Sequence, residues 1–393
     1  MNTLRSLPAP ALALALAAAL PTTASAQATQ AELYIDVATH TMPGMPGMGA
    51  LGRMAGAMGA GAAPGYGMAR HPGMPGKYLD VALHNQRRPG TPARQAVPKG
   101  LRLGERIDLL PPASKSGNDA TPAANDALGQ HGDGSFRIRY YWGCGEQVRA
   151  GQPAEFTVTV RNGKVVQSGR AMTPRQVPQH AVGQDPRYAL WPNPSARKTV
   201  AGNASLAGTH TVTGEQLPAS LQFELGRDHD FMPELKLKSE GDAGQGMTLR
   251  WDGVDGARAY FIHGTAMDGE TIVMWSSSED GYAGQELIDF LPESLVAQWT
   301  GKRTLMGADA RSCRIPREVF AGTGKGTPML QMVAYGNDRT IAQPGWSVRV
   351  RTKSTAMLMS GLGGAATQEA GREAAKPAAK DAAKSVLRGL IGR

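Results

Sequence analysis

The chain has 393 residues, enough for two or three ordinary domains, and a formal net charge of +9. Only 19% of the residues are charged, so the basic excess is spread over the surface rather than gathered into a nucleic-acid footprint. The sequence contains no run of interleaved arginine and aromatic residues. These features exclude nucleic-acid binding from the expected functions and favour an anionic partner, such as lipid headgroups or cell-wall polymers.

The first residues have the three parts of an export signal. Arg5 supplies a positive charge, residues 9–20 form an apolar run, and the small residues that end at Ala26 or Ala28 fit a signal-peptidase site. The apolar run is far shorter than the roughly 20 residues of a membrane anchor. We expect residues 1–26 to be a signal peptide and the mature protein to be periplasmic or secreted. Its partner would be an unknown envelope or extracellular component.

Residues 27–134 form a low-complexity region rich in methionine, glycine and proline. It contains two near-copies of one segment, "YIDVATH" at 34–40 and "YLDVALH" at 78–84, and each alternates in the manner of a strand. The spacer between them has too few β-branched and aromatic residues to order itself. We therefore expect two strands joined by a long loop.

Methionines and histidines in this region suggest a copper site. The candidate ligands are His40, Met42, Met45, Met48, Met68, His71 and Met74. Thioethers are soft ligands suited to copper(I), and imidazole accepts either oxidation state of copper. In "HTMPGMPGMG", type II turns would bring successive methionine Cα atoms within about 7 Å, whereas a polyproline II conformation would separate them by about 9 Å. Copper binding thus depends on the local conformer, and a spacer or adhesive segment is the alternative.

A first β-rich domain is expected at residues 135–238. Its segments "FRIRYYWG", "AEFTVTVRNG" and "KVVQSGRAM" alternate as strands, and "THTVTG" and "SLQFELG" are further candidates. Asn162-Gly163 is a strong signal for a two-residue hairpin turn between the second and third of these segments.

A second β-rich domain is expected at residues 239–357. Its segment "LRWDGVDGARAYFI" resembles the B–C strands of a fibronectin type III domain, in which a buried tryptophan and an aromatic residue of the next strand share the core between two sheets. In this chain the resemblance gives those places to Trp251 and to the pair Tyr260-Phe261. It extends over residues 247–352 and implies a β-sandwich. Residues 283–320 depart from it, because the family's middle connection is shorter.

The segments "YYWGCGE", "VMWSSS", "CRIPREVF" and "MLQMVAYG" together resemble an uncharacterised family of exported Gram-negative bacterial proteins. That resemblance implies an exported location and β domains that fold together, and it implies no activity. The predicted fold is therefore all-β, with two immunoglobulin- or fibronectin III-like sandwich domains, a low-complexity N-terminal region and a short C-terminal helix.

Residues 358–393 form a basic tail rich in alanine and lysine. Lys376, Lys380, Lys384 and Arg388 are spaced four apart, which places them in one stripe on a helix that begins near Pro377. Such a helix could bind an anionic membrane surface or a partner. A frayed, solvated terminus is the alternative, because a helix of about four turns is marginal in water.

The two cysteines, Cys144 and Cys313, are expected to form a disulfide in an oxidising compartment. The alternative is a reactive thiol at the glycine-flanked Cys144, which needs a base and an electropositive environment that the sequence does not identify.

Catalytic motifs are absent from the sequence. "GTGKGT" at 322–327 lacks the first glycine and the Ser/Thr of a phosphate-binding loop, and neither a nucleophile elbow nor a zinc signature occurs. Asp228-His229-Asp230 alternates between two faces, and His263 lies near "SSSED" with nothing to orient it. We expect a non-enzymatic binding or envelope-structural protein. A copper-binding protein is the first alternative, and a hydrolase of envelope polymers is the second.

Overall fold

The described part of the chain is mostly β structure. The computed structural model describes residues 29–43, 65–71, 73–112, 134–161, 164–169, 175–178, 182, 185–269, 271–281, 283–323 and 328–359. Strands greatly outnumber helices within these ranges, which confirms the predicted all-β class. The predicted signal peptide and tail helix lie outside the described residues. None of the helices found in these ranges combines the length and apolar character that a membrane crossing needs.

One large sheet contains eleven strands in the order β7-β6-β5-β14-β13-β17-β18-β1-β2-β8, with β15 paired to β13. Their bounds are β1 Ala31–Thr41, β2 Gly76–Asn85, β5 Gly134–Trp142, β6 Ala154–Arg161, β7 Lys164–Gly169, β8 Tyr188–Trp191, β13 Ala259–Asp268, β14 Thr271–Ser276, β15 Met306–Gly307, β17 Met329–Gln343 and β18 Trp346–Met359.

Two smaller sheets and a few short helices pack against the large sheet. The four-stranded sheet, β10-β9-β3-β4, comprises β3 Ala93–Ala96, β4 Arg106–Leu109, β9 Gly208–Gly214 and β10 Gln222–Leu225. The three-stranded sheet, β11-β12-β16, comprises β11 Leu237–Asp242, β12 Gly246–Trp251 and β16 Ser312–Ile315. The helices are η1 Lys99–Leu101, η2 Arg227–His229, η3 Gln285–Ile288, α3 Glu293–Gly301 and α4 Arg317–Phe320.

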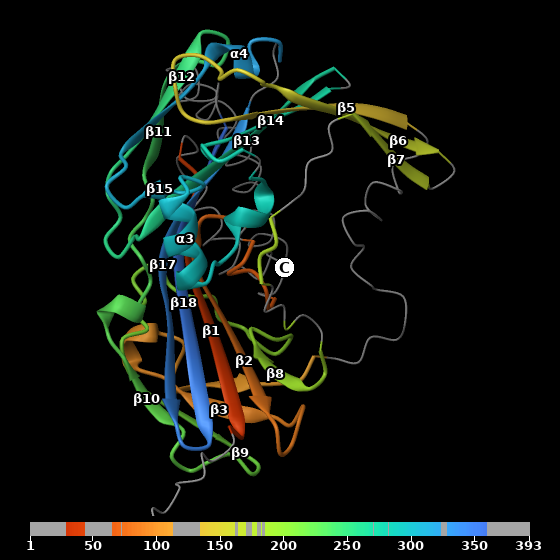
Figure 1. Ribbon diagram of the computed structural model, residues 1–393. Coiled ribbons are helices and arrows are strands. Elements are labelled where there is room, and N and C mark those ends of the chain that lie inside the picture. Colours follow the sequence, from red (N-terminus) through yellow and green to blue (C-terminus); the bar gives the residue numbers. More distant parts are fainter. Residues whose placement is uncertain are drawn as a thin grey trace, which may run out of the picture.

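The hairpin of β17 and β18 runs along most of the length of the molecule (Figure 1). These strands contain 15 and 14 residues. β18 also pairs in parallel with β1, and β14 pairs in parallel with β5. The large sheet therefore combines strands from all three predicted segments, 27–134, 135–238 and 239–357. The division of the last two into separate domains stays a prediction.

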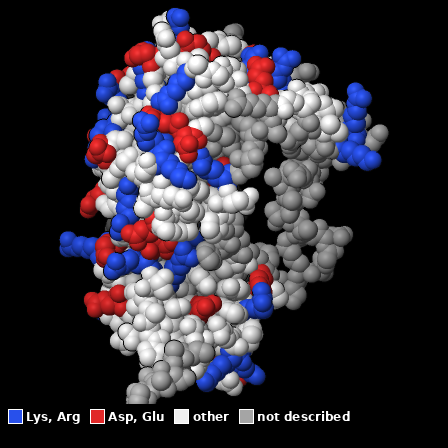
Figure 2. Space-filling model, viewed as in Figure 1, with Lys and Arg blue, Asp and Glu red and all other residues white. Residues whose placement is uncertain are grey.

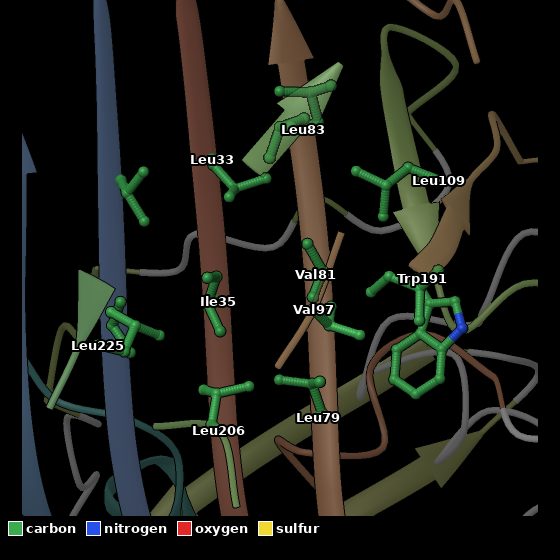
Figure 3. Packing of buried hydrophobic residues seen from close by; sticks show 14 of the residues in the cluster. Leu33, Ile35, Leu79, Val81, Leu83, Val97, Leu109, Trp191, Leu206 and Leu225 are labelled. Carbon is green, nitrogen blue, oxygen red and sulfur yellow. The ribbon is translucent and has the colours of Figure 1, made fainter. Parts of the chain in front are cut away.

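The two near-copies form β1 and β2, which pair antiparallel with Asp36 directly opposite Asp80. This pairing confirms the prediction of two strands from "YIDVATH" and "YLDVALH". Their apolar residues, among them Ile35 and Val81, face the four-stranded sheet and form a core with Val97 and the residues around it (Figure 3). The alternate residues of both strands, most of them polar, face the opposite side of the large sheet.

A second core lies between the three-stranded sheet and the large sheet. Trp251 of β12 and Tyr260 of β13 have ring centroids 5.6 Å apart, and the backbone N–H of Val254 donates to the Tyr260 hydroxyl at 3.0 Å. The two strands belong to different sheets. The tryptophan and the aromatic residue of the next strand therefore share a core between two sheets.

Strands β5, β6 and β7, here called the arm, extend from the body at the upper right of Figure 1. Arg161 pairs directly with Lys164, so β6 and β7 form a hairpin with a two-residue loop. The hairpin predicted from Asn162-Gly163 is thus confirmed.

Cys144 and Cys313 form a disulfide with a Cα–Cα distance of 5.3 Å. The predicted pairing is confirmed, and neither cysteine is free. Cys144 follows β5 and Cys313 lies in β16, so the bond ties the base of the arm to the three-stranded sheet. Two hydrogen bonds support the same junction, from Trp275 Nε1 to the Gly143 carbonyl at 3.0 Å and from the Gly145 N–H to the Arg314 carbonyl at 2.9 Å.

Candidate functional site

Four charged side chains lie buried beside one another on the polar face of the large sheet. Asp36 of β1 stands opposite both Arg351 of β18 and Asp80 of β2. Lys353 follows Arg351 at the next position on the same face. Each of the four residues is at most 3% exposed. Because directly opposite residues on neighbouring strands lie about 5 Å apart on one face, the strand register brings these charges together.

Asp36 and Arg351 form the centre of this buried network. The guanidinium of Arg351 donates from Nε to Asp36 Oδ1 at 2.7 Å and from Nη2 to Oδ2 at 2.6 Å. Such two-pronged bonds are among the strongest ion pairs in proteins. The Phe290 ring packs on the same guanidinium, with its centroid 4.9 Å from the Arg351 Cζ atom.

Two chain segments cover the network, and Lys353 holds both of them. Its Nζ donates to the Arg70 carbonyl at 2.7 Å and to the Ile288 carbonyl at 3.0 Å. Arg70 in turn places its guanidinium 3.8 Å from Asp36 and 3.7 Å from Asp289. Burial lowers the pKa of Lys353 to about 8. The arrangement fixes residues 65–71 and η3 on the sheet, which is a structural role.

Asp80 is the residue of this network whose ionised form is the least stable. Burial, and then repulsion from Asp36, raise its pKa to about 7, although its Oδ2 accepts a 2.9 Å bond from the Ala69 N–H. A carboxyl whose pKa is raised in the folded state destabilises the fold once it must ionise. With Asp80 neutral, below the ordinary pKa of aspartate, the free energy of unfolding is not reduced by this residue. It falls as pH rises through about 7 and Asp80 ionises.

Asp80→Asn should therefore gain stability relative to the native protein as pH rises. We expect the difference in free energy of unfolding between the two proteins to grow in favour of the variant from pH 5 to pH 8, measured by urea unfolding. Asp108→Asn, at an exposed carboxylate, is the control and should show no such trend. A native protein that loses no stability relative to Asp80→Asn over this range would contradict the assignment.

His40 lies at the end of β1, next to the charged network. It is 5% exposed, and its Nδ1 lies 2.7 Å from the Thr355 hydroxyl. Nε2 is buried and has no hydrogen-bond partner among the described residues. Burial, and to a smaller extent Lys353, lower the pKa of His40 to about 4, so the ring is neutral at pH 7. A neutral imidazole with one nitrogen held by a neighbour has its other nitrogen oriented for a ligand.

The structure brings together the histidines of the two predicted clusters. His40 and His71 line one cavity of about 160 Å³, together with Gln285, Gln331 and Met357. His71 is exposed and His40 is buried, so the cavity reaches from the surface to the sheet.

The methionines of the predicted clusters lie elsewhere. Met42 lines a separate cleft of about 620 Å³ that also borders His40. Met68 is half-buried in the segment before Arg70, and Met74 is exposed. None of these three lines the cavity of His71. Met45 and Met48 lie outside the described residues.

The other polar groups singled out in the sequence lie in a turn and in a strand pair. His229 Nε2 and His263 Nε2 are buried with no hydrogen-bond partner among the described residues. His229 Nδ1 lies 2.8 Å from an Asp228 oxygen, and Asp230 Oδ1 accepts the Leu206 N–H at 2.7 Å, as expected for a turn. His263 and Ser276 stand opposite each other in β13 and β14, and both are at most 2% exposed. The Ser276 hydroxyl is 2.6 Å from the Tyr140 hydroxyl, not aimed at a solvent-filled cleft.

The arm has a free strand edge. In the described ranges β7 pairs with β6 alone, whereas the opposite edge strand, β8, is also bridged to Leu110. Lys164, Val166 and Ser168 of β7 are exposed, and Val166 is 59% exposed. An exposed edge presents unpaired N–H and C=O groups to which another extended chain can add.

Sequence reasoning did not find Met357, Arg351 or Lys353. All three lie in "WSVRVRTKSTAML" at residues 346–358. Basic and apolar residues alternate there, which predicts a strand with one buried face and one solvent-exposed face. A useful signal was present in the near-copies, where Asp36 and Asp80 occupy equivalent places between apolar residues. Paired carboxylates in strands this apolar indicate a buried counter-charge.

Comparisons of the chain with protein-family models, with curated proteins and with solved structures find no match. The chain's own geometry is therefore the basis for a functional assignment.

Proposed function

We propose that this is an exported, non-enzymatic binding protein that captures an extended segment of an envelope or extracellular partner along strand β7. The observation that carries the proposal is the free, exposed edge of β7 at the end of an arm that stands away from the body (Figure 1). In β-augmentation, main-chain hydrogen bonds to such an edge provide affinity, and alternate side chains provide selectivity.

The hairpin geometry indicates which groups of β7 a partner would meet. In a two-residue hairpin the closing pair, Arg161 and Lys164, is hydrogen-bonded, and the pattern then alternates along the strands. Val165 and Gln167 therefore turn their N–H and C=O groups toward the free edge. Val166 and Ser168 use theirs within the hairpin.

The charge of the arm favours an acidic partner. From residue 134 to residue 169 there are five basic residues and two acidic residues, which leaves a net charge of +3. Lysine and arginine side chains gather at the end of the arm (Figure 2). The positive charge would raise the association rate of an acidic segment and would disfavour the binding of basic segments.

The proposal includes an exported location and a sandwich fold. The Cys144–Cys313 disulfide supports an oxidising compartment such as the periplasm or the extracellular space. The contact between Trp251 and Tyr260 across two sheets supports a fibronectin III-like sandwich within residues 239–357.

Gln167→Pro should weaken capture at β7. Proline removes the outward N–H, and its ring obstructs an incoming strand, yet it is tolerated at an edge. We expect the full chain to retain immobilised ten-residue peptides that alternate valine or threonine with aspartate or glutamate. Gln167→Pro should weaken that binding by about tenfold or more, because at least one hydrogen bond is lost.

Gln167→Ala keeps the backbone N–H and is the matched control, with peptides carrying lysine in place of the acidic residues as the second control. Retention of acidic peptides by the native protein and by the alanine variant, but not by the proline variant, supports the proposal. Equal retention by both variants, or of both peptide types, contradicts it.

A further inference from the structure

We propose that the cavity between β1, β18 and residues 70–71 is a copper(I) site, whose ligands are the imidazoles of His40 and His71 and the thioether of Met357. This function is independent of peptide capture at β7. It differs from the site predicted by sequence because the two histidines come from both N-terminal clusters, whereas the sulfur comes from the far end of the chain.

His40 is the ligand of the proposed site whose orientation is already fixed. Its ring is fixed because Nδ1 lies 2.7 Å from the Thr355 hydroxyl, while Nε2 is buried and has no protein partner among the described residues. When Nδ1 donates to Thr355, Nε2 carries a free lone pair, the state that a metal ligand needs. A buried ring nitrogen without a partner is costly to keep, and a bound ion would satisfy it.

Strand register places Met357 beside His40. His40 of β1 stands opposite Thr355 of β18, and Met357 is two residues further along β18, on the same face. Met357 is half-buried and lines the cavity with both histidines. Met332 also borders the cavity, but it stands opposite Ala356, and the two pack in the core on the other face of the sheet.

The chemistry of the wall favours a soft ion of low charge. The described residues that line the cavity include two histidines, two methionines, two glutamines and Arg70, and none of them is a carboxylate. Calcium and magnesium need oxygen ligands, usually with carboxylates, so this wall does not fit them. Imidazole and thioether together suit copper(I).

The charged residues near the cavity also favour a monovalent ion over a divalent ion. Arg70 is one of the lining residues, and its guanidinium lies 3.8 Å from Asp36, which is also bonded to Arg351, and 3.7 Å from Asp289. A site made of neutral ligands near these arginines offers no net negative charge to a divalent ion. A monovalent ion meets half the electrostatic penalty of a divalent ion at the same distance from any remaining positive charge.

The test is titration of the full chain with copper(I), held in competition with a chromogenic copper(I) chelator. We expect one tightly bound ion per chain. Met357→Leu, which keeps the volume of the side chain, and His71→Ala, at an exposed position, should each weaken binding at least tenfold. X-ray absorption of the loaded protein should show nitrogen and sulfur neighbours, with the sulfur contribution lost in Met357→Leu.

Met42→Leu and Met74→Leu are matched controls, because they remove cluster methionines that do not line the cavity. They should bind copper(I) within about twofold of the native protein. His40→Leu should also lose the ion, and thermal unfolding of each variant separates loss of a ligand from loss of the fold.

Two results would overturn the site. One is a folded full chain that takes up no copper(I) under these conditions. The other is binding that survives Met357→Leu and His71→Ala but is lost in Met42→Leu or Met74→Leu, which would assign the ion to the N-terminal clusters alone. Zinc bound as tightly as copper(I) would also contradict the assigned ligand chemistry.

Discussion

Replacement of Cys144 and Cys313 by serine should lower the free energy of unfolding by about 5 kcal/mol. The bond joins residues separated by 169 positions, so it restricts a very long loop of the unfolded chain. In the loop-entropy model the stabilisation increases with the length of that loop. Guanidinium unfolding of the oxidised native protein and of the double variant measures the difference.

The native protein treated with reductant is the control, and it should unfold at the same denaturant concentration as the double variant. Before reduction, both cysteines should resist alkylation, as judged by mass spectrometry. Coincident unfolding curves of the oxidised native protein and the double variant would show that the bond contributes nothing to stability.

Loss of the disulfide should also make the orientation of the arm less constrained. Cys144 lies two residues after the end of β5, between Gly143 and Gly145, whose hydrogen bonds to Trp275 and Arg314 hold the same junction. With the bond removed, the arm keeps only non-covalent contacts with the body, among them these hydrogen bonds and the β5–β14 pairing. We therefore expect the stability loss to be accompanied by weaker peptide capture at β7.

Asp36→Ala should destabilise the fold by about 3–5 kcal/mol, the usual range for removing one partner of a buried ion pair. The variant leaves the Arg351 guanidinium, 2% exposed, without the carboxylate that accepts two of its hydrogen bonds. The Asp36–Arg70 contact is lost in the same step. Urea unfolding at pH 7 measures the loss.

A double-mutant cycle tests whether the loss belongs to the pair. Arg351→Met alone should also be destabilising, and Asp36→Leu combined with Arg351→Met should recover part of the loss, because no buried charge is then left unpaired at this position. Glu240→Ala is the matched control. It breaks an ion pair of similar length, 3.0 Å to Arg250, between side chains about 60% exposed.

We expect Glu240→Ala to change stability by about 1 kcal/mol or less, because exposed pairs are solvated and screened. Equal effects of Asp36→Ala and Glu240→Ala would mean that the buried network contributes no more than a surface pair.

The features that sequence reasoning predicted correctly depend on short stretches of chain. Alternation of apolar and polar residues predicts β1 and β2, and Asn162-Gly163 predicts the hairpin of β6 and β7. The disulfide was also predictable, because a chain with only two cysteines and a predicted export signal has one pairing available. In each case the deciding information lies in local periodicity, turn chemistry or counting.

The candidate sites depend on contacts between distant parts of the chain. Arg351 meets Asp36 across 315 positions, and His40 meets Thr355 across the same separation, because β18 pairs in parallel with β1. Residue periodicity predicts that a strand has a buried face, but not which distant strand lies beside it or in which register.

The sequence by itself thus determined an all-β chain with strands, a hairpin and one cross-link. Only the tertiary structure decided that β7 ends the large sheet among the described strands, that His71 lies with His40, and that Met357 rather than a cluster methionine lines their cavity. The physical reason is that sheet order and register are set by the complementary burial of whole faces, a property of many distant residues together rather than of any one segment.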